Sequence, residues 1–83
     1  MFVNYYSTEV GMIDVLAKRV FELFHIRISE DAYSISLFEL GLSVEQVLYF
    51  LIDISKSQKF NLEEYYNSLK NCSLMEIQEY IRN

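Results

Sequence analysis

Residues 40–54 read LGLSVEQVLYFLIDI, and this stretch decides the fold of the 83-residue chain. Gly41, near the start of this stretch, breaks the apolar pattern before the helix begins. Ser43 and Gln46 then have the spacing of a capping box, in which two side chains satisfy free backbone amides at a helix start. Residues 44–54 are apolar almost all round. Such a helix is either central to the fold or buries its outer face against something else.

The residues before this stretch predict a first helix and a long connection. Residues 13–24 have apolar side chains at three- and four-residue spacing, Ser7 or Thr8 can cap the helix start, and we expect its end near His25. The connection, roughly Arg27–Leu42, is rich in serine and acidic residues. It also carries apolar residues that predict a path over the core, namely Ile28, Ile35, Leu37, Phe38 and Leu40.

The residues after it predict a short third helix and a fourth helix. Ser55–Lys59 reads as a polar loop, and Asn61 can then cap the third helix. Ser73 and Glu76 form a second capping box, which opens the fourth helix. The fourth helix is expected to place Leu74, Ile77 and Ile81 on one face.

Composition agrees with an all-α fold. The chain is 52% hydrophobic and has no proline and only 2 glycines, which favours helices joined by short polar loops over a β-sandwich. A chain of this length has room for one domain. We therefore expect a single domain over residues 1–83, in which the apolar and aromatic residues 1–7 are an N-terminal extension.

Charge and cysteine content exclude several classes of function. The net charge of -5 disfavours nucleic-acid binding, which needs a basic face. The absence of a long apolar run and of a basic leader predicts a cytoplasmic protein that does not bind membranes. One cysteine and one histidine cannot form a zinc site, so we expect no metal and a buried Cys72.

The order of these elements resembles the acyl and peptidyl carrier protein family. Three stretches carry the likeness: residues 13–24, residues 37–44, and residues 60–64 followed by residues 73–81. The middle one, LFELGLSV, resembles the family pattern of a phenylalanine- and acid-containing run, Leu-Gly, a variable residue and Asp-Ser-Leu. The resemblance covers roughly residues 10–82. It implies a four-helix acyl-carrier-protein-like bundle with a long first loop and a short third helix, which catalyses no reaction itself.

The resemblance makes Ser43 a candidate for covalent modification. In that family the serine of Asp-Ser-Leu carries 4′-phosphopantetheine, on which acyl or aminoacyl groups travel as thioesters to biosynthetic enzymes. This implies Ser43 as the attachment residue, modified by a phosphopantetheinyl transferase. In a gapless alignment, however, the family's Asp falls on Ser43 and its Ser on Val44, which cannot be esterified. Ser43 is therefore either the carrier serine, with the alignment shifted by one residue, or only a helix N-cap.

Other functions follow from the helix over residues 44–54. Its only acids are Glu45 and Asp53, beside the aromatics Tyr49 and Phe50, so we expect partners to dock on it through apolar contact. The alternative function is an unmodified carrier-related interaction module that docks on a biosynthetic or peptide-maturation enzyme through this helix. A third is a small helical adaptor or oligomeric bundle unrelated to carriers. The same apolar surface predicts weak self-association.

Overall fold

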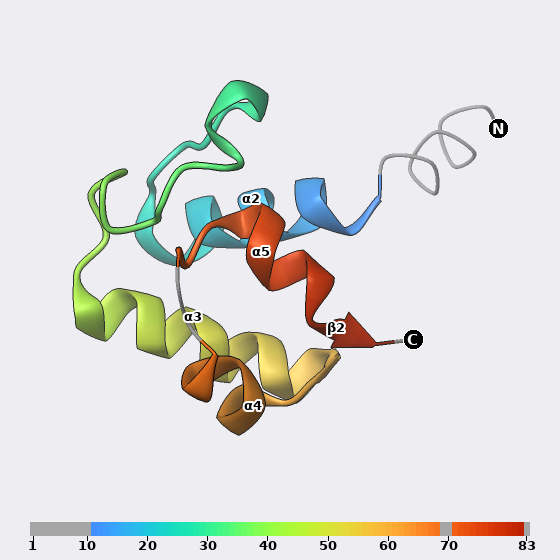
Figure 1. The fold of residues 1–83 in the computed structure, drawn as a ribbon. Helices are drawn as coiled ribbons and strands as arrows, with labels where there is room; N and C mark the ends of the chain where they lie inside the picture. Colours follow the sequence, from blue (N-terminus) through green and yellow to red (C-terminus); the bar gives the residue numbers. More distant parts are fainter. Residues whose placement is uncertain (1–10, 69–70, 83) are drawn as a thin grey trace, which may run out of the picture.

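The computed structural model describes residues 11–68 and 71–82 of the chain. The all-α fold class is confirmed, because helices dominate these residues and strand is limited to one pair of two-residue segments. The elements, drawn in Figure 1, are α2 (Met12–Phe24), the 3-10 turn η1 (Glu30–Ala32), α3 (Val44–Ser57), β1 (Lys59–Phe60), α4 (Leu62–Asn67), α5 (Leu74–Glu79) and β2 (Ile81–Arg82).

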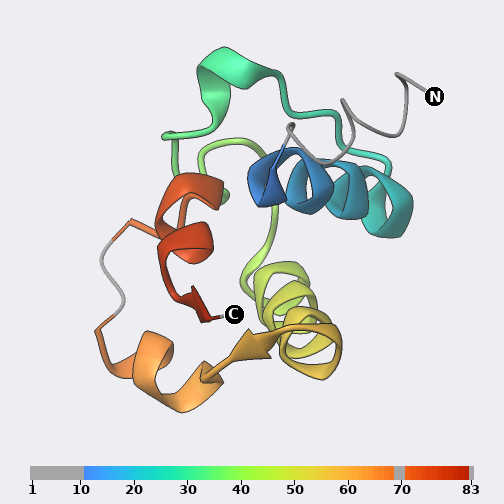
Figure 2. The same ribbon diagram turned by 90° about the vertical axis from the view of Figure 1, so that its right-hand side faces the viewer.

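The two long helices, α2 and α3, form the body of the fold, and the two short ones pack on different partners. Figures 1 and 2 show α5 alongside α2 and α4 beside α3. Backbone contacts agree, since α5 contacts α2, whereas α3 contacts α2, α4 and β1. The expected role of α3 as the central helix is thus shared with α2. The reason is that α5 packs on α2 and not mainly on α3. It is also bonded to the long connection, because the Met75 amide donates to the Tyr33 carbonyl at 3.0 Å.

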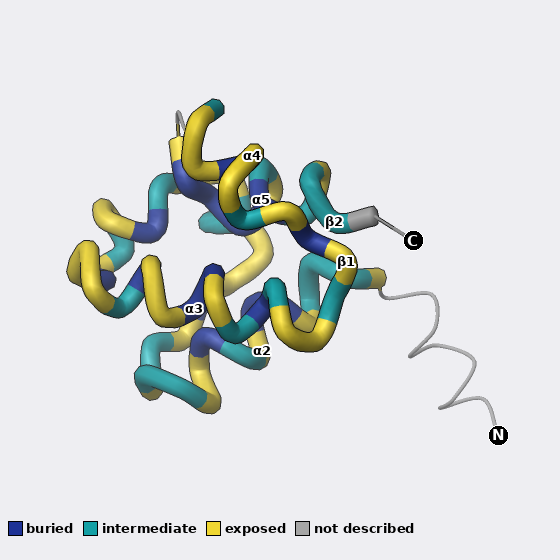
Figure 3. The backbone as a smooth tube through the Cα atoms, turned by 90° about the horizontal axis from the view of Figure 1, so that it is seen from below, coloured by how far each residue is buried: buried dark blue, intermediate teal, exposed yellow. Residues whose placement is uncertain are grey.

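The core lies between these helices, and α3 contributes only one of its faces to it. Its buried residues are Val47, Phe50, Leu51 and Ile54. The rest of its surface leaves large apolar side chains exposed, namely Val44, Leu48, Tyr49 and Ile52. Figure 3 shows this alternation of buried and exposed turns along α3. The apolar composition of α3 therefore serves both a core face and an open face.

Local capping follows the sequence closely. Ser43 and Gln46 make both bonds of a capping box at the start of α3. The Asn61 side chain accepts a hydrogen bond from the Glu64 amide at 2.9 Å and starts α4. At α5 the Ser73 hydroxyl accepts from the Glu76 amide at 3.2 Å, but only this half of the predicted capping box forms, because the Glu76 carboxylate binds the Asn71 and Cys72 amides instead. These short polar signals fix helix starts because each one supplies an acceptor that the first turn lacks.

The start of the first long helix differs from the sequence-based expectation. Ser7 and Thr8 lie outside the described residues, and α2 begins at Met12 after Gly11. Gly11 has a φ of 90°, which is not helical and is accessible to glycine without strain. The predicted end is confirmed, because His25 closes α2 in the left-handed conformation and its amide donates to the Phe21 carbonyl at 2.7 Å.

Two further boundaries were predicted wrongly. The expected polar loop Ser55–Lys59 is helical up to Ser57. Its serines fit the last turn of the helix because the Ser55 hydroxyl donates to the Ile52 carbonyl at 2.7 Å. The fourth helix ends at Glu79, so Ile81 does not extend it. Ile81 instead pairs antiparallel with Phe60, which joins β2 to β1.

The long connection covers the core as predicted, although not all of its apolar residues are buried. Ile28, Leu37 and Leu42 are buried, whereas Ile35 and Phe38 are exposed. The connection is held on the α2 side by the Tyr33 hydroxyl, which donates to Asp14 at 2.7 Å. This bond, together with burial, raises the pKa of Tyr33 to about 12.

Candidate functional site

Ser43 lies exposed at the start of α3 and makes two local hydrogen bonds. Its Oγ accepts from the Gln46 amide at 3.1 Å, and its own amide donates to Gln46 Oε1 at 2.9 Å. The prediction that Ser43 caps this helix is confirmed. Its hydroxyl also faces solvent at the N-terminus of a 14-residue helix, where the helix dipole favours negative charge.

An apolar hollow of about 120 Å³ begins one residue beyond Ser43. It lies between the first half of α3, the long connection, α4 and the turn before α5. Its walls are Phe38, Val44, Val47, Leu48, Leu51, Tyr66 and Cys72. None of the described residues that line it is charged, so the hollow is suited to an apolar group.

The rim and the floor of the hollow come from three separate segments. Phe38 and Tyr66 are 41% and 63% exposed and stand at its edge. Cys72 is 1% exposed and belongs to its inner wall. The amide of Phe38 donates to Ser36 Oγ at 3.2 Å, which fixes the turn that presents the ring. Tyr66 is held by α4, whose first turn Asn61 caps.

A partly buried polar cluster supports the inner wall. Glu76 Oε1 accepts from the Cys72 amide at 2.6 Å, from the Asn71 amide at 3.2 Å and from the Tyr65 hydroxyl at 2.8 Å. Cys72 has a φ of 61°, an uncommon conformation for a residue other than glycine. The three bonds to one carboxylate oxygen hold this turn in place.

The buried thiol is not built for nucleophilic chemistry. Burial raises the pKa of the Cys72 thiol, and burial also raises the pKa of the neighbouring Tyr65 hydroxyl. Both groups are therefore neutral near pH 7, and the thiolate is the reactive form of cysteine. The prediction of a buried Cys72 is confirmed.

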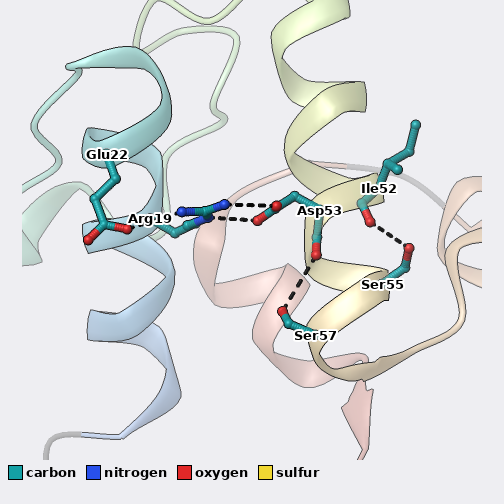
Figure 4. A network of polar contacts seen from close by, with 6 residues as sticks. All are labelled: Arg19, Glu22, Ile52, Asp53, Ser55 and Ser57. Atoms are coloured by element: carbon teal, nitrogen blue, oxygen red, sulfur yellow. Dashed lines mark hydrogen bonds and ion pairs between the residues drawn. The ribbon is translucent and has the colours of Figure 1, made fainter.

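An ion pair joins α3 to α2, as Figure 4 shows. Arg19 on α2 donates to both carboxylate oxygens of Asp53 on α3, at 2.7 and 2.9 Å, and contacts Glu22 at 3.3 Å. The bonds to Asp53 raise the pKa of Arg19, and Arg19 in turn lowers the pKa of Asp53. By helical geometry Val44 and Leu48 lie on the other side of α3 from Asp53, where they line the hollow.

Other site types are not formed by the described residues. Within residues 11–68 and 71–82 no group of three or more histidine, cysteine or acidic side chains is placed to hold a metal ion. In the same part of the chain no helix is long and apolar enough to cross a bilayer. The candidate site is thus the exposed hydroxyl of Ser43 together with the apolar hollow beside it.

Sequence reasoning found Ser43 and the apolar face of α3 but missed the hollow. Phe38, Tyr66 and Cys72 are far apart in the chain, and only tertiary packing brings them to one wall. A usable signal was the aromatic residue in the long connection, since an exposed phenylalanine in a loop is often part of a contact surface. No protein-family model, curated protein or solved structure matches this chain.

Proposed function

We propose that this chain is a non-catalytic, acyl-carrier-protein-like domain that binds a biosynthetic or peptide-modifying enzyme through the first half of α3. The observation that carries the proposal is the apolar hollow, whose outer wall is made by Val44 and Leu48 and whose rim is made by Phe38 and Tyr66. Its volume of about 120 Å³ suits one branched or aromatic side chain of the partner.

Two features support docking of the unmodified protein. The side chain and the amide of Ser43 both take part in a complete capping box, a role that needs no cofactor. The next residue, Val44, is 66% exposed and has no group that can be esterified. Large apolar side chains exposed in a contiguous group on a small acidic domain indicate a protein-binding surface.

The loaded carrier is the second candidate, favoured by the position of the Ser43 hydroxyl. The hydroxyl is exposed, and a phosphodiester there would lie at the N-terminus of α3, where the backbone amides and the helix dipole favour an anion. The hollow begins at the adjacent residue and would accept an apolar group. The residues present therefore fit 4′-phosphopantetheine, whose terminal thiol would supply the thioester linkage.

Intact mass separates the two candidates. The protein is co-expressed with a broad-specificity phosphopantetheinyl transferase, and a known carrier protein is the positive control. The docking module gains no mass. A gain of one phosphopantetheine group that Ser43→Ala and Ser43→Asp both abolish would identify the loaded carrier. Ser43→Asp keeps the N-cap, so loss of the gain in that variant reports the missing hydroxyl and not a damaged helix.

Binding is mapped by amide chemical shifts. Purified biosynthetic and peptide-modifying enzymes of the source organism are titrated into isotope-labelled protein. Shifts are expected to centre on Phe38, Val44, Leu48 and Tyr66, and Leu48→Glu should weaken binding about tenfold or more by placing a charge in the apolar contact. The matched control is Glu30→Lys, an exposed change on η1, which contributes no residue to the lining of the hollow. Shifts confined to α2 or α5 would contradict the proposal.

A further inference from the structure

An exposed line along α3 carries a second surface, which is separate from the walls of the hollow. It borders α2 at one point, where the Tyr49 ring contacts the Phe24 ring edge-on at a centroid distance of 6.2 Å. Glu45, Tyr49, Ile52 and Lys56 follow one another at spacings of four, three and four residues. At about 100° per residue these spacings keep all four within about 40° of one line along the helix. All four are exposed, Tyr49 by 57% and Ile52 by 39%. We call these four residues the α3 crest.

The order of chemical groups along the crest is self-complementary. Glu45 is an acid in the first turn and Lys56 a base in the last turn, with the two large apolar side chains between them. The remaining carboxylate of α3, Asp53, is held to the side by Arg19 of α2. Read from its N-terminus, the crest is therefore negative, aromatic, aliphatic and positive.

We propose that the α3 crest binds the α3 crest of a second copy of this chain, with the two helices antiparallel and related by a two-fold axis. Glu45 then faces Lys56 of the second copy, and Tyr49 packs on Ile52 of the second copy. Because the axis is two-fold, each of these contacts is made twice. A parallel arrangement would place Glu45 beside Glu45 and Lys56 beside Lys56, which is unfavourable.

The order of charges along the crest selects the antiparallel orientation of a second copy. The chain has a net charge of -5, so two copies repel each other overall and association has to overcome this repulsion. The antiparallel crest contact offsets it with two attractive pairs around an apolar centre. A helix of 14 residues is about 21 Å long, so the interface is small and the dimer is weak and concentration-dependent.

The inference goes beyond the proposed function and does not depend on it. The enzyme contact uses the walls and rim of the hollow, whereas self-association uses the crest. A protein that binds the enzyme but does not dimerise would therefore overturn the dimer alone. A protein that dimerises through the crest but binds no enzyme would overturn the proposed function alone.

Sedimentation equilibrium of the full chain at about 0.15 M salt tests the pairing. Glu45→Lys and Lys56→Glu each turn both charge pairs repulsive and should weaken the dimer about tenfold. The double variant, Glu45→Lys with Lys56→Glu, restores the opposite charges and should return the dissociation constant to near the wild-type value. Lys18→Glu and Glu30→Lys, exposed positions outside α3, make the same net-charge changes and should leave it unchanged.

Fold stability cannot imitate this pattern. Both reversals oppose the helix dipole of α3, so the double variant has the least favourable helix of the set. Association that returns in that variant therefore reports pairing of charges, and circular dichroism melts verify that all variants are folded. A wild-type protein that stays monomeric at millimolar concentration overturns the proposal. So does a double variant that associates no better than the single ones.

Discussion

Arg19 and Asp53 join the two long helices through two parallel hydrogen bonds of 2.7 and 2.9 Å. This geometry uses the planar fork of the guanidinium against both oxygens of one carboxylate. It joins the Asp53 side of α3 to α2. The other α3 side chains are divided among the core, the wall of the hollow and the exposed crest.

A double-mutant cycle measures this contact. Arg19→Met and Asp53→Asn should each lower the thermal midpoint by about 1–6 °C, because a partly exposed pair contributes modestly to a domain of this size. The double variant should lose less than the sum of the two, since both partners of the same pair are then gone. Lys18→Met, one residue away and exposed, is the control and should change the midpoint little. Strict additivity would show that the pair contributes no coupling energy.

Acid should remove the contribution of Asp53. Arg19 lowers the pKa of the folded Asp53 carboxyl below its ordinary value of 3.8. The unfolded chain therefore binds the proton more readily, and the stabilisation is fully present above the unfolded pKa. It is lost as the pH falls through the lower folded pKa. Thermal melts of wild type and Asp53→Asn should differ at pH 7 and converge as the pH falls from about 5 to 2. A constant difference over this range would contradict the assignment.

A charge on the core face of α3 should unfold the domain. Leu51 and Ile54 are each 3% exposed, and Leu51→Asp or Ile54→Asp buries a carboxylate without a partner. The expected loss is about 3–5 kcal/mol of unfolding free energy, which is comparable with the whole stability of a small domain. Ile52→Asp, on the exposed side of the same helix, is the matched control and should stay folded. Urea denaturation of the three variants distinguishes these outcomes.

The Cys72 thiol should report opening of the C-terminal part of the fold. The thiol is buried and its pKa is raised by burial, so the native protein should react with iodoacetamide at least about a hundredfold more slowly than a free thiol. Glu76→Ala removes the acceptor of the Cys72 amide and of the Tyr65 hydroxyl and should speed the reaction. Glu76→Gln keeps an acceptor oxygen and is the control. Fast labelling of the native wild type would show that this turn is open.

The sequence predicted what is encoded locally. Ser43, Asn61 and Ser73 all start helices, because an N-cap depends on residues within one turn. The end of α2 at His25 and the burial of Cys72 follow from similarly short-range or compositional arguments. These predictions required no knowledge of which helices pack together.

The features that sequence reasoning missed depend on contacts between distant residues. The pairing of Phe60 with Ile81 ends the last helical segment early, although nothing near Ile81 in the chain opposes helix. The hollow forms only when Phe38, Tyr66 and Cys72 meet the wall of α3. For Ser43, local sequence identified the cap but cannot distinguish a cap from a carrier serine, because both need the same exposed position.

The two short strands have a mechanical consequence for the C-terminal region. By pairing Lys59 with Arg82 and Phe60 with Ile81, they close α4 and α5 into a single loop with a hydrogen-bonded neck. Closing such a loop costs chain entropy. This cost is offset only when the strand pairing at the neck and the packing of the buried side chains form together. The neck therefore couples α4, which packs on α3, to α5, which packs on α2, so we expect loss of the strand pair to weaken contacts with both long helices.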